Sequence, residues 1–494
     1  MQVQDATLIT FVAYLALILF LGIRAFRRTK DLGDYILGGR TQGPVVTALS
    51  AGASDMSGWL LLGLPGAIYL YGMSEIWIGI SLAIGAYLNW LFISKPLRAH
   101  TVHGADSLTL PDYFANRFGA YGRELRIVAA LVILLFFIFY TAAGLVAGAV
   151  LFENSFGLDY HMALFIGGFI IVAYTFVGGY LAVAWTDAIQ ALLMMLALLL
   201  APILVLANTG GITATWQAME SVNAGSTSLL GQLGVLGLVS ALAWGLGYVG
   251  QPHILARFMA VSSVRELDSA RRIAMTWVVL VLGGSIATGL VGIVYFAEAP
   301  LANPETVFIT LSQSLFNPWI AGIITAAILS AIMSTIDSQL LVSSSVVGKD
   351  LYRMFLRPTA DDRELVAVSR GAVVVIALLA WWIAADPESR VLDLVSYAWA
   401  GFGASFGPVI VFSLFWRRMT ALSAIIGMAL GALTVVIWSN LSGGLFDIYE
   451  IMPGFLLASL AIVTVSLYRP EQDAEVLARY DGAEAMLNAS GANE

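Results

Sequence analysis

Long apolar runs alternate with short polar stretches along almost the whole chain. Each run extends for about 20 residues or more, the length that an α-helix needs to cross the hydrocarbon core of a bilayer. The pattern therefore predicts an all-α membrane protein with about thirteen transmembrane helices. The predicted segments are residues 6–26, 45–70, 75–94, 125–151, 161–183, 187–208, 231–255, 273–297, 317–347, 367–385, 391–416, 421–441 and 450–468.

Two of these segments contain residues that disfavour a continuous helix. The second segment holds Ser50–Gly66 (SAGASDMSGWLLLGLPG), in which glycines and serines surround the carboxylate of Asp55. The seventh holds Trp244–Pro252 (WGLGYVGQP), with three glycines and a proline in nine residues. Unwound backbone at membrane depth is tolerated where it lines a cavity or is buried in protein, and an acid there usually has a function. Close packing of helices is the alternative explanation for the small residues. We favour an ion or substrate site at the breaks.

The two disrupted segments lie five spans apart. Two five-span units, at about 45–208 and 231–416, would have opposite orientations because five is odd. Paired broken helices in inverted halves indicate a transporter with its site at the midplane of the membrane. We divide the chain accordingly into a peripheral N-terminal helix and loop (1–40), two repeats (41–209 and 210–418), two peripheral helices (419–469) and a polar cytoplasmic tail that suits a solvated segment (470–494).

The ninth segment carries a second polar cluster. Ser334 and Ser338 share one face of the predicted helix, and Thr335 and Asp337 lie beside them. Hydroxyl groups in membrane helices most often bond to their own backbone or to a neighbouring helix. Several oxygens with an acid nearby also suit a hard cation. Opposite a broken helix, the cluster favours a cation site.

Two further polar residues are each open to two interpretations. Asp187, where the sixth segment begins, either caps a helix N-terminus or lies on a cation path. Tyr140, in the fourth segment, is either a packed core residue or a ligand contact.

A short interfacial helix is expected at 109–118, with Pro111 in its first turn.

Composition and charge set the membrane orientation. The chain is 59% hydrophobic and 11% charged, with a mean hydropathy of +0.87. If the loop after the first segment is cytoplasmic, all of the 24 Lys and Arg residues except Arg390 lie on the cytoplasmic side, Arg257 among them. The positive-inside rule then predicts an external N-terminus and a cytoplasmic C-terminus.

The same composition disfavours several function classes. A nucleic-acid partner has no basic patch to bind, and four histidines, no cysteine and no clustered acid–base pair argue against an enzyme. A passive channel is disfavoured because paired broken helices favour a closed midplane site. A membrane sensor without useful flux is disfavoured because no kinase-like domain follows the last segment. No obligatory protein partner is indicated, and the lipid bilayer is the expected surrounding.

Several long stretches resemble the solute:sodium symporter family, and within it the members that transport proline. The resemblance covers nearly the whole chain. It rests on DYILGGR (34–40), TALSAGASDMSGWLLLGLPGA (47–67), LTLPDYF (108–114), ALVILLFF (130–137), WTD (185–187), ILSAIMST (328–335) and VSYAWAGFGASFGP (395–408). It implies a LeuT-type fold in a bacterial inner membrane, with ten core helices in two inverted five-helix repeats, one extra N-terminal helix and two extra C-terminal helices. The implied function is uptake of L-proline with sodium, with another small amino or carboxylic acid as the alternative substrate.

The resemblance also implies the roles of particular residues. Sodium would be held by the carbonyls of Ala53, Met56 and Ala331 and the hydroxyls of Ser334 and Thr335, with Asp55 close by. The proline pocket would be lined by Ser57, Gly58, Trp59, Tyr140, Trp244, Tyr248 and Pro252. Asp187, Asp337 and Ser338 are candidates for a second cation path. A serine can occupy the position of Asp337 in the family members that this chain resembles most, whereas other members carry an acid there, so whether Asp337 adds a cation site stays open.

Overall fold

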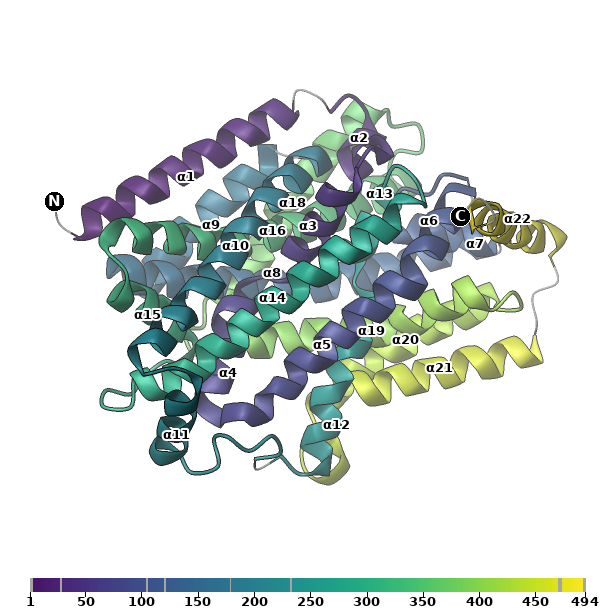
Figure 1. Cartoon of the computed structure of the whole chain (residues 1–494). Helices are drawn as coiled ribbons and strands as arrows, with labels where there is room; N and C mark the ends of the chain where they lie inside the picture. The colour runs from purple at the N-terminus through teal and green to yellow at the C-terminus, as the bar shows by residue number, and fades with distance from the viewer. Residues whose placement is uncertain are drawn as a thin grey trace.

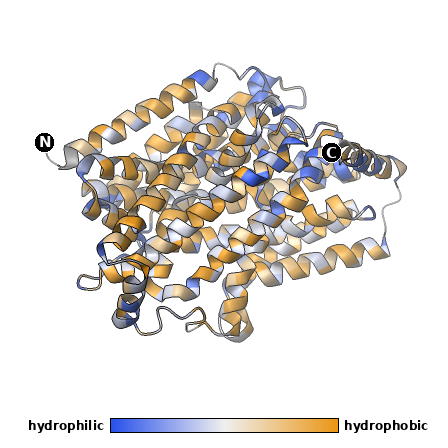
Figure 2. Cartoon of the chain, in the orientation of Figure 1, coloured by the Kyte–Doolittle hydropathy of each residue, from blue (hydrophilic) through white to orange (hydrophobic). Residues whose placement is uncertain are grey.

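The fold is a bundle of long helices that run side by side (Figure 1). The computed structural model describes residues 3–26, 29–103, 105–119, 121–177, 179–231, 233–469 and 473–491. Within these residues all regular structure is helical apart from an isolated β-bridge between Gln42 and Val261. Hydrophobic residues cover the long helices, and hydrophilic ones concentrate at helix ends and in loops (Figure 2). Both features agree with the predicted all-α membrane protein.

The α-helices of the described residues range in length from 3 to 35 residues. They are α1 (Val3–Phe26), α2 (Leu32–Leu37), α3 (Pro44–Asp55), α4 (Leu64–Tyr71), α5 (Ile76–Leu88), α6 (Ser94–His103), α7 (Leu110–Phe118), α8 (Gly122–Phe156), α9 (Tyr160–Val177), α10 (Tyr180–Asn208), α11 (Ile212–Val222), α12 (Val235–Ala243), α13 (Pro252–Ala260), α14 (Glu266–Tyr295), α15 (Val307–Leu315), α16 (Pro318–Ser345), α17 (Arg353–Phe355), α18 (Asp362–Ala384), α19 (Val391–Phe415), α20 (Ala421–Trp438), α21 (Ile451–Tyr468) and α22 (Ala474–Gly491).

The number of spans differs from the sequence prediction. Ten helical stretches in the described residues are long and apolar enough to cross a membrane, and eleven if a bent pair counts as one span. The stretch Trp59–His103 is counted once, although it holds the end of the second predicted segment and all of the third. The seventh predicted segment corresponds to the bent pair, Val235–Gly250 and Pro252–Ala260. The fifth corresponds to the apolar stretch Tyr160–Phe176, which is shorter than the stretches counted as spans. The predicted count of thirteen is therefore not confirmed.

Both predicted helix breaks are present. α3 ends at Asp55, and Met56 leaves the helical conformation (φ −89°, ψ 84°) before the chain continues through a π-helical turn, Trp59–Gly63, into α4. In the seventh segment a 3₁₀-helix, Trp244–Gly250, follows α12, and Gln251 is extended (φ −80°, ψ 109°). Because a residue before proline disfavours the α conformation, Pro252 starts a new helix, α13, and the pair is bent by 42°.

The two breaks meet the polar helix of the ninth segment. α3 packs against α10, α13, α14 and α16, and α16 also contacts α13. This arrangement brings the end of the first broken helix together with the hydroxyl cluster of α16. Packing of this kind leaves Ala53, Asp55 and the α16 hydroxyls buried.

The elements outside this centre agree only in part with prediction. The interfacial helix α7 begins as expected, because the Thr109 side chain accepts a hydrogen bond from the Asp112 amide (3.2 Å) and Pro111 lies in the first turn. α1 lies along one edge of the bundle (Figure 1) and packs against α10 and α16.

The described part of the C-terminal tail is not a solvated segment. Residues 474–491 form α22, which packs against α6 and α7. Tyr480 is buried and donates a hydrogen bond to the Leu414 carbonyl (3.0 Å), and Arg417 makes two bonds of 2.7 Å to Asp481. A few apolar residues among many polar ones are enough to hold this helix. Residues 470–472 and 492–494 of the predicted tail lie outside the described residues.

Candidate functional site

Four of the five expected sodium ligands lie together where α3 meets α16. The carbonyl oxygen of Ala53 accepts hydrogen bonds from the hydroxyls of Ser334 (2.7 Å) and Thr335 (3.3 Å). The same two hydroxyls lie 3.1 and 3.3 Å from the carbonyl oxygen of Ala331. Met56, the fifth expected ligand, is buried in the broken turn after α3, and its part in the site stays a prediction.

The chemistry of these atoms suits a small monovalent cation. The last carbonyls of a helix have no partner within the helix and carry its partial negative charge, so the Ala53 carbonyl is a natural cation ligand. Serine and threonine hydroxyls add neutral oxygens, which hard cations accept. Unwound backbone carbonyls of this kind coordinate sodium in transporters with broken helices. The residues present therefore fit a sodium ion.

Asp55 connects this cluster to the aromatic residues of the expected pocket. Its side chain is 2% exposed, and Oδ2 accepts a hydrogen bond from the Tyr248 hydroxyl (2.6 Å). Its backbone carbonyl accepts from the Trp59 indole (3.0 Å) and the Tyr140 hydroxyl (3.3 Å). Oδ1 of Asp55 has no hydrogen-bond partner in the part of the chain that the structure describes. The acid thus joins both broken helices at one point.

The other expected pocket residues surround the breaks. The Ser57 hydroxyl accepts from the Trp59 amide (3.4 Å). A Cβ on Gly58 would lie 2.6 Å from the Cβ of Ala147, so α8 packs against the bare backbone of this glycine. On the second broken helix, the Trp244 ring stacks on Tyr449 (5.1 Å between centroids, 29° between planes).

Pro252 lies at a different place from the aromatic residues. It begins α13 and lines a small cavity of about 20 Å³ together with Tyr180, Arg257 and Ser345. Its role at the helix break is confirmed by the bend. A direct contact with substrate stays a prediction.

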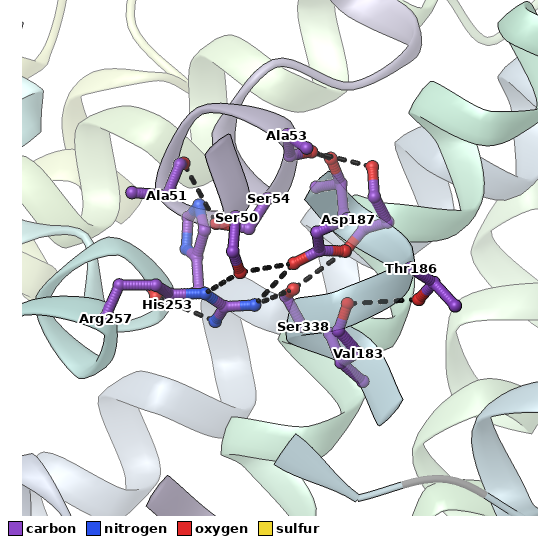
Figure 3. Close-up of polar contacts among 12 residues, drawn as sticks. Ser50, Ala51, Ala53, Ser54, Val183, Thr186, Asp187, His253, Arg257 and Ser338 are labelled. Carbon is purple, nitrogen blue, oxygen red and sulfur yellow. Dashed lines mark hydrogen bonds and ion pairs between the residues drawn. The ribbon is translucent and has the colours of Figure 1, made fainter. Parts of the chain in front are cut away.

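Arg257 binds two of the three candidates for a second cation path, Asp187 and Ser338. Figure 3 shows Asp187, Ser50 and Ser338 gathered around Arg257. Nη2 of Arg257 lies 3.2 Å from Oδ2 of Asp187 and 2.5 Å from the Ser338 hydroxyl. Ser50 donates to the same Asp187 oxygen (2.6 Å), and Nη1 of Arg257 donates to the His253 carbonyl (2.9 Å). A fixed cationic group therefore lies between two of the three candidates.

Asp337, the third candidate, bonds elsewhere. Its Oδ1 accepts a hydrogen bond from Thr175 on α9, and its Oδ2 has no hydrogen-bond partner among the described residues. The side chain is 1% exposed. The structure thus does not place Asp337 in the Arg257 cluster.

One interpretation from the sequence is wrong at this cluster. Asp187 does not cap a helix, because α10 begins at Tyr180 and Asp187 lies about two turns inside it. Arg257, which the sequence places on the cytoplasmic side, is fully buried. A buried guanidinium is tolerated because Asp187 offsets its charge and four polar groups accept its hydrogen bonds. The signal that could have found the pair is an acid at the start of one apolar segment and an arginine two residues beyond the end of another, since a charge at membrane depth is costly when it is alone.

Comparison with known proteins shows the family to which the chain is similar. Residues 35–431 match the sequence profile of the Sodium:solute symporter family. The sodium/proline symporters of Salmonella typhimurium (strain LT2) and Escherichia coli (strain K12) are each 51% identical over 491 residues, which is 98% of this chain and 97% of theirs. The high-affinity proline transporter of Bacillus subtilis (strain 168) is 49% identical over 452 residues, 91% of this chain and 95% of that protein.

Solved structures of other transporters share the fold. A Na⁺-coupled sialic acid symporter in a substrate-bound, outward-open state has a TM-score of 0.80 at 20% identity, over 94% of this chain and 99% of that one. MhsT in complex with L-phenylalanine has a TM-score of 0.52 at 15% identity, over 86% of this chain and 98% of that one. These likenesses confirm the predicted LeuT-type architecture, while the residue boundaries of the two repeats stay a prediction.

Proposed function

The chain belongs to the Sodium:solute symporter family, and we propose that it takes up L-proline by sodium-coupled symport. It is a multi-pass membrane transporter and not an enzyme. The observation that carries the proposal is the position of Asp55, which joins the oxygen cluster of α3 and α16 to Tyr248 of the second broken helix. The names of the relatives that match nearly the whole chain support proline as the substrate.

Sodium and proline would be coupled through the two broken helices. In this proposal sodium binds the carbonyls of Ala53, Met56 and Ala331 and the hydroxyls of Ser334 and Thr335, and so draws α3 toward α16. Because Tyr248 donates to Asp55, a fixed α3 also fixes one aromatic residue of the substrate pocket. By linkage, sodium then raises the affinity for proline by the same factor as proline raises the affinity for sodium.

The pocket would recognise the two ends of the zwitterion separately. Backbone N–H groups at a helix break attract an anionic group, and we assign the proline carboxylate to the turn at Ser57 and Gly58. Tyr140, Trp244 and Tyr248 would enclose the apolar ring, with Trp59 holding the Asp55 carbonyl. Another small amino or carboxylic acid is the alternative substrate.

We further propose a single sodium per transported proline. The guanidinium of Arg257 already neutralises Asp187 and bonds Ser338, so a second cation would be repelled there. Asp337 is a separate position at which a second cation would have one free carboxylate oxygen. Transport with one sodium moves one charge per proline, and transport with a second sodium at Asp337 moves two.

The proposed location is the inner membrane of a bacterium, with the N-terminus outside and the C-terminus in the cytoplasm. The distribution of Lys and Arg supports this orientation. The start of α1 and the helix α22 lie at opposite ends of the bundle (Figure 1), as termini on opposite sides of a membrane require.

Transport by the purified protein in proteoliposomes tests the function. We expect radiolabelled L-proline to accumulate above its external concentration when an inward sodium gradient is imposed, and to stop accumulating when potassium replaces sodium. Equilibration without accumulation would indicate a channel, and no flux at all would indicate a sensor. Sodium-dependent accumulation of another radiolabelled small amino or carboxylic acid, with no accumulation of proline, would make that acid the substrate.

A further inference from the structure

Trp399 lies in the motif VSYAWAGFGASFGP (395–408), and it faces the second broken helix. It is on α19, is 1% exposed, and donates its indole N–H to the backbone carbonyl of Trp244 (2.8 Å). Its ring meets the ring of Tyr248 edge-on, with 5.0 Å between centroids and 87° between planes. One side chain thus touches both aromatic residues that the second broken helix contributes to the proposed proline pocket.

The bare backbone of two glycines in the 3₁₀ segment packs directly on α19. A Cβ on Gly247 would collide with the indole nitrogen of Trp399, and a Cβ on Gly250 would collide with the Phe402 carbonyl. The side-chain amide of Gln251 links the 3₁₀ segment to α19, because it donates hydrogen bonds to the carbonyls of Gly247 (3.1 Å) and Trp399 (3.3 Å). Glycines at these positions let the indole reach a carbonyl that would otherwise be covered.

The form of this segment decides how its side chains spread. In an α-helix, two residues four positions apart lie only about 40° apart around the axis. In a 3₁₀-helix, with three residues per turn, the same two residues lie about 120° apart. Residues 244–250 are 3₁₀-helical, so Trp244 and Tyr248 point in clearly different directions. In an α-helix the same two side chains would point in almost the same direction.

We propose that Trp399 is a positioning residue for substrate selection. Its indole N–H gives the Trp244 carbonyl a partner outside its own helix, which keeps residues 244–250 in the 3₁₀ form and sets the spacing between Trp244 and Tyr248. The substrate class is a small amino acid with an apolar ring, and ring size is the property that this spacing selects. The inference rests on the proposed proline transport.

Two substitutions separate the hydrogen bond from the bulk of the side chain. Trp399→Phe keeps an aromatic ring and removes the donor. Trp399→His removes the second ring and keeps a donor, because Nε2 of histidine is reached from Cα through the same number of bonds as Nε1 of tryptophan. Trp438→Phe is the matched control, since Trp438 also donates to a carbonyl, that of Ile448 (3.0 Å), outside the proposed pocket.

Uptake kinetics in proteoliposomes give the test. For Trp399→Phe we expect the KM for L-proline to rise roughly 3- to 10-fold, the loss of one hydrogen bond, with kcat and the half-saturating sodium concentration unchanged. The preference for proline over L-pipecolate, its six-membered homologue, should narrow. Trp399→His should keep the wild-type KM to within about twofold, and Trp438→Phe should change nothing.

Other outcomes overturn the inference. An unchanged KM in Trp399→Phe, an equal rise in Trp399→His, or the same rise in Trp438→Phe would each remove the assigned role of the N–H group. If Trp399→Phe does not reach the membrane, the KM of Trp399→His decides alone, with a tenfold rise counting against the proposal. Failure of the wild-type protein to accumulate proline would instead reject the proposed function itself.

Discussion

The proposed sodium ligands at the meeting of α3 and α16 are neutral oxygens. The hydroxyls of Ser334 and Thr335 reach the Ala53 carbonyl on the other helix. To bind an ion, each hydroxyl must turn a lone pair toward it, and the Ala53 carbonyl must share its lone pairs between the ion and these hydroxyls. The affinity for sodium at these residues is therefore the difference between two arrangements of the same atoms.

Removing either hydroxyl should weaken sodium binding. In Ser334→Ala and Thr335→Ala the ion loses one oxygen ligand, and we expect the sodium concentration for half-maximal uptake to rise about tenfold, or ~1.4 kcal/mol. Ser343→Ala is the control, because that hydroxyl bonds within its own helix to the Gln339 carbonyl (2.6 Å). Sodium dependence that is the same in all three variants and the wild type would place the cation elsewhere.

Asp55→Asn should have a larger effect than either hydroxyl variant. The amide keeps the volume of the side chain and removes the charge that offsets the dehydration of sodium. We expect the half-saturating sodium concentration to rise by more than about tenfold, and proline uptake at fixed sodium to fall with it. Equilibrium binding of ²²Na⁺ checks this without transport, and wild-type sodium affinity in this variant would exclude Asp55 from the ion site.

Sequence reasoning reached most of this centre but missed its cationic residue. Serine, threonine and aspartate in apolar segments are visible as exceptions, because polar groups are costly at membrane depth. Arg257 follows a helix break near the end of an apolar segment, where a basic residue normally faces the cytoplasm. Only the fold shows that Asp187, on a distant segment, neutralises it.

At the scale of the element, the position of each break could be predicted and its form could not. Glycine and proline mark where a helix cannot continue. The 3₁₀ form of residues 244–250 depends on α19, whose Trp399 and Phe402 approach Gly247 and Gly250. Such contacts join residues about 150 positions apart, so no local pattern reveals them.

The interfacial helix α7 is held to the end of the α16 segment by a network of charges. Asp112 accepts hydrogen bonds from Lys349 (2.6 Å) and Arg126 (2.5 Å), and Arg126 also bonds Asp350 (2.6 Å). Burial raises the pKa of the Asp112 carboxyl, but Lys349 and Arg126 outweigh it, so the pKa lies below its usual value. The charged form of Asp112 therefore stabilises the fold.

Asp112→Asn should lower the stability of the detergent-solubilised protein. Removing one partner of a buried ion pair leaves the others uncompensated, and we expect a loss on the order of 3 kcal/mol, read as a lower melting temperature. Asp106→Asn is the control, because the Asp106 side chain is 70% exposed in its pair with Arg40 and such pairs contribute less than about 1 kcal/mol.

The pH dependence of this network follows from the lowered pKa. The stability is present above the carboxyl pKa of the unfolded chain, about 3.9, and is lost as the pH falls through the lower pKa of the folded state. We thus expect Asp112→Asn still to have a lower melting temperature than the wild type at pH 5, although Asp350, which shares Arg126 with Asp112, can change the size of the difference. A difference that disappears by pH 5 would mean that Asp112 is already protonated there.

At the scale of the whole molecule, the fold class and the two broken helices could be predicted from the sequence. Apolar length and paired breaks are properties of single segments, and the structural relatives confirm the architecture they indicate. The count of spans could not be predicted in the same way, because it depends on where bent helices are divided. The helix α22 escaped prediction, because its buried residues, Val476, Tyr480 and Ala483, are few among polar neighbours.

The stoichiometry of transport is a property of the whole cycle. One cation that moves through 100 mV releases about 2.3 kcal/mol, and a tenfold sodium gradient adds about 1.4 kcal/mol. One sodium per proline therefore supports accumulation of about several hundredfold. We expect the reversal potential in vesicles to report one charge per proline. Two charges would mean that Asp337 builds a second cation site, and Asp337→Asn should then restore one.

The packing of α1 has a consequence for how the protein is made. Tyr14 of α1 accepts a hydrogen bond from Gln190 on α10 (2.8 Å), and Gly322 of α16 packs directly against Thr10. α16 begins only at Pro318, so at about 5–20 residues per second of synthesis, roughly 15–60 s separate the emergence of the two helices from the ribosome. During that interval the face of α1 that carries Thr10 lacks its final neighbour on α16. α1 is synthesised well before α16 and therefore reaches its final packing only after a long delay.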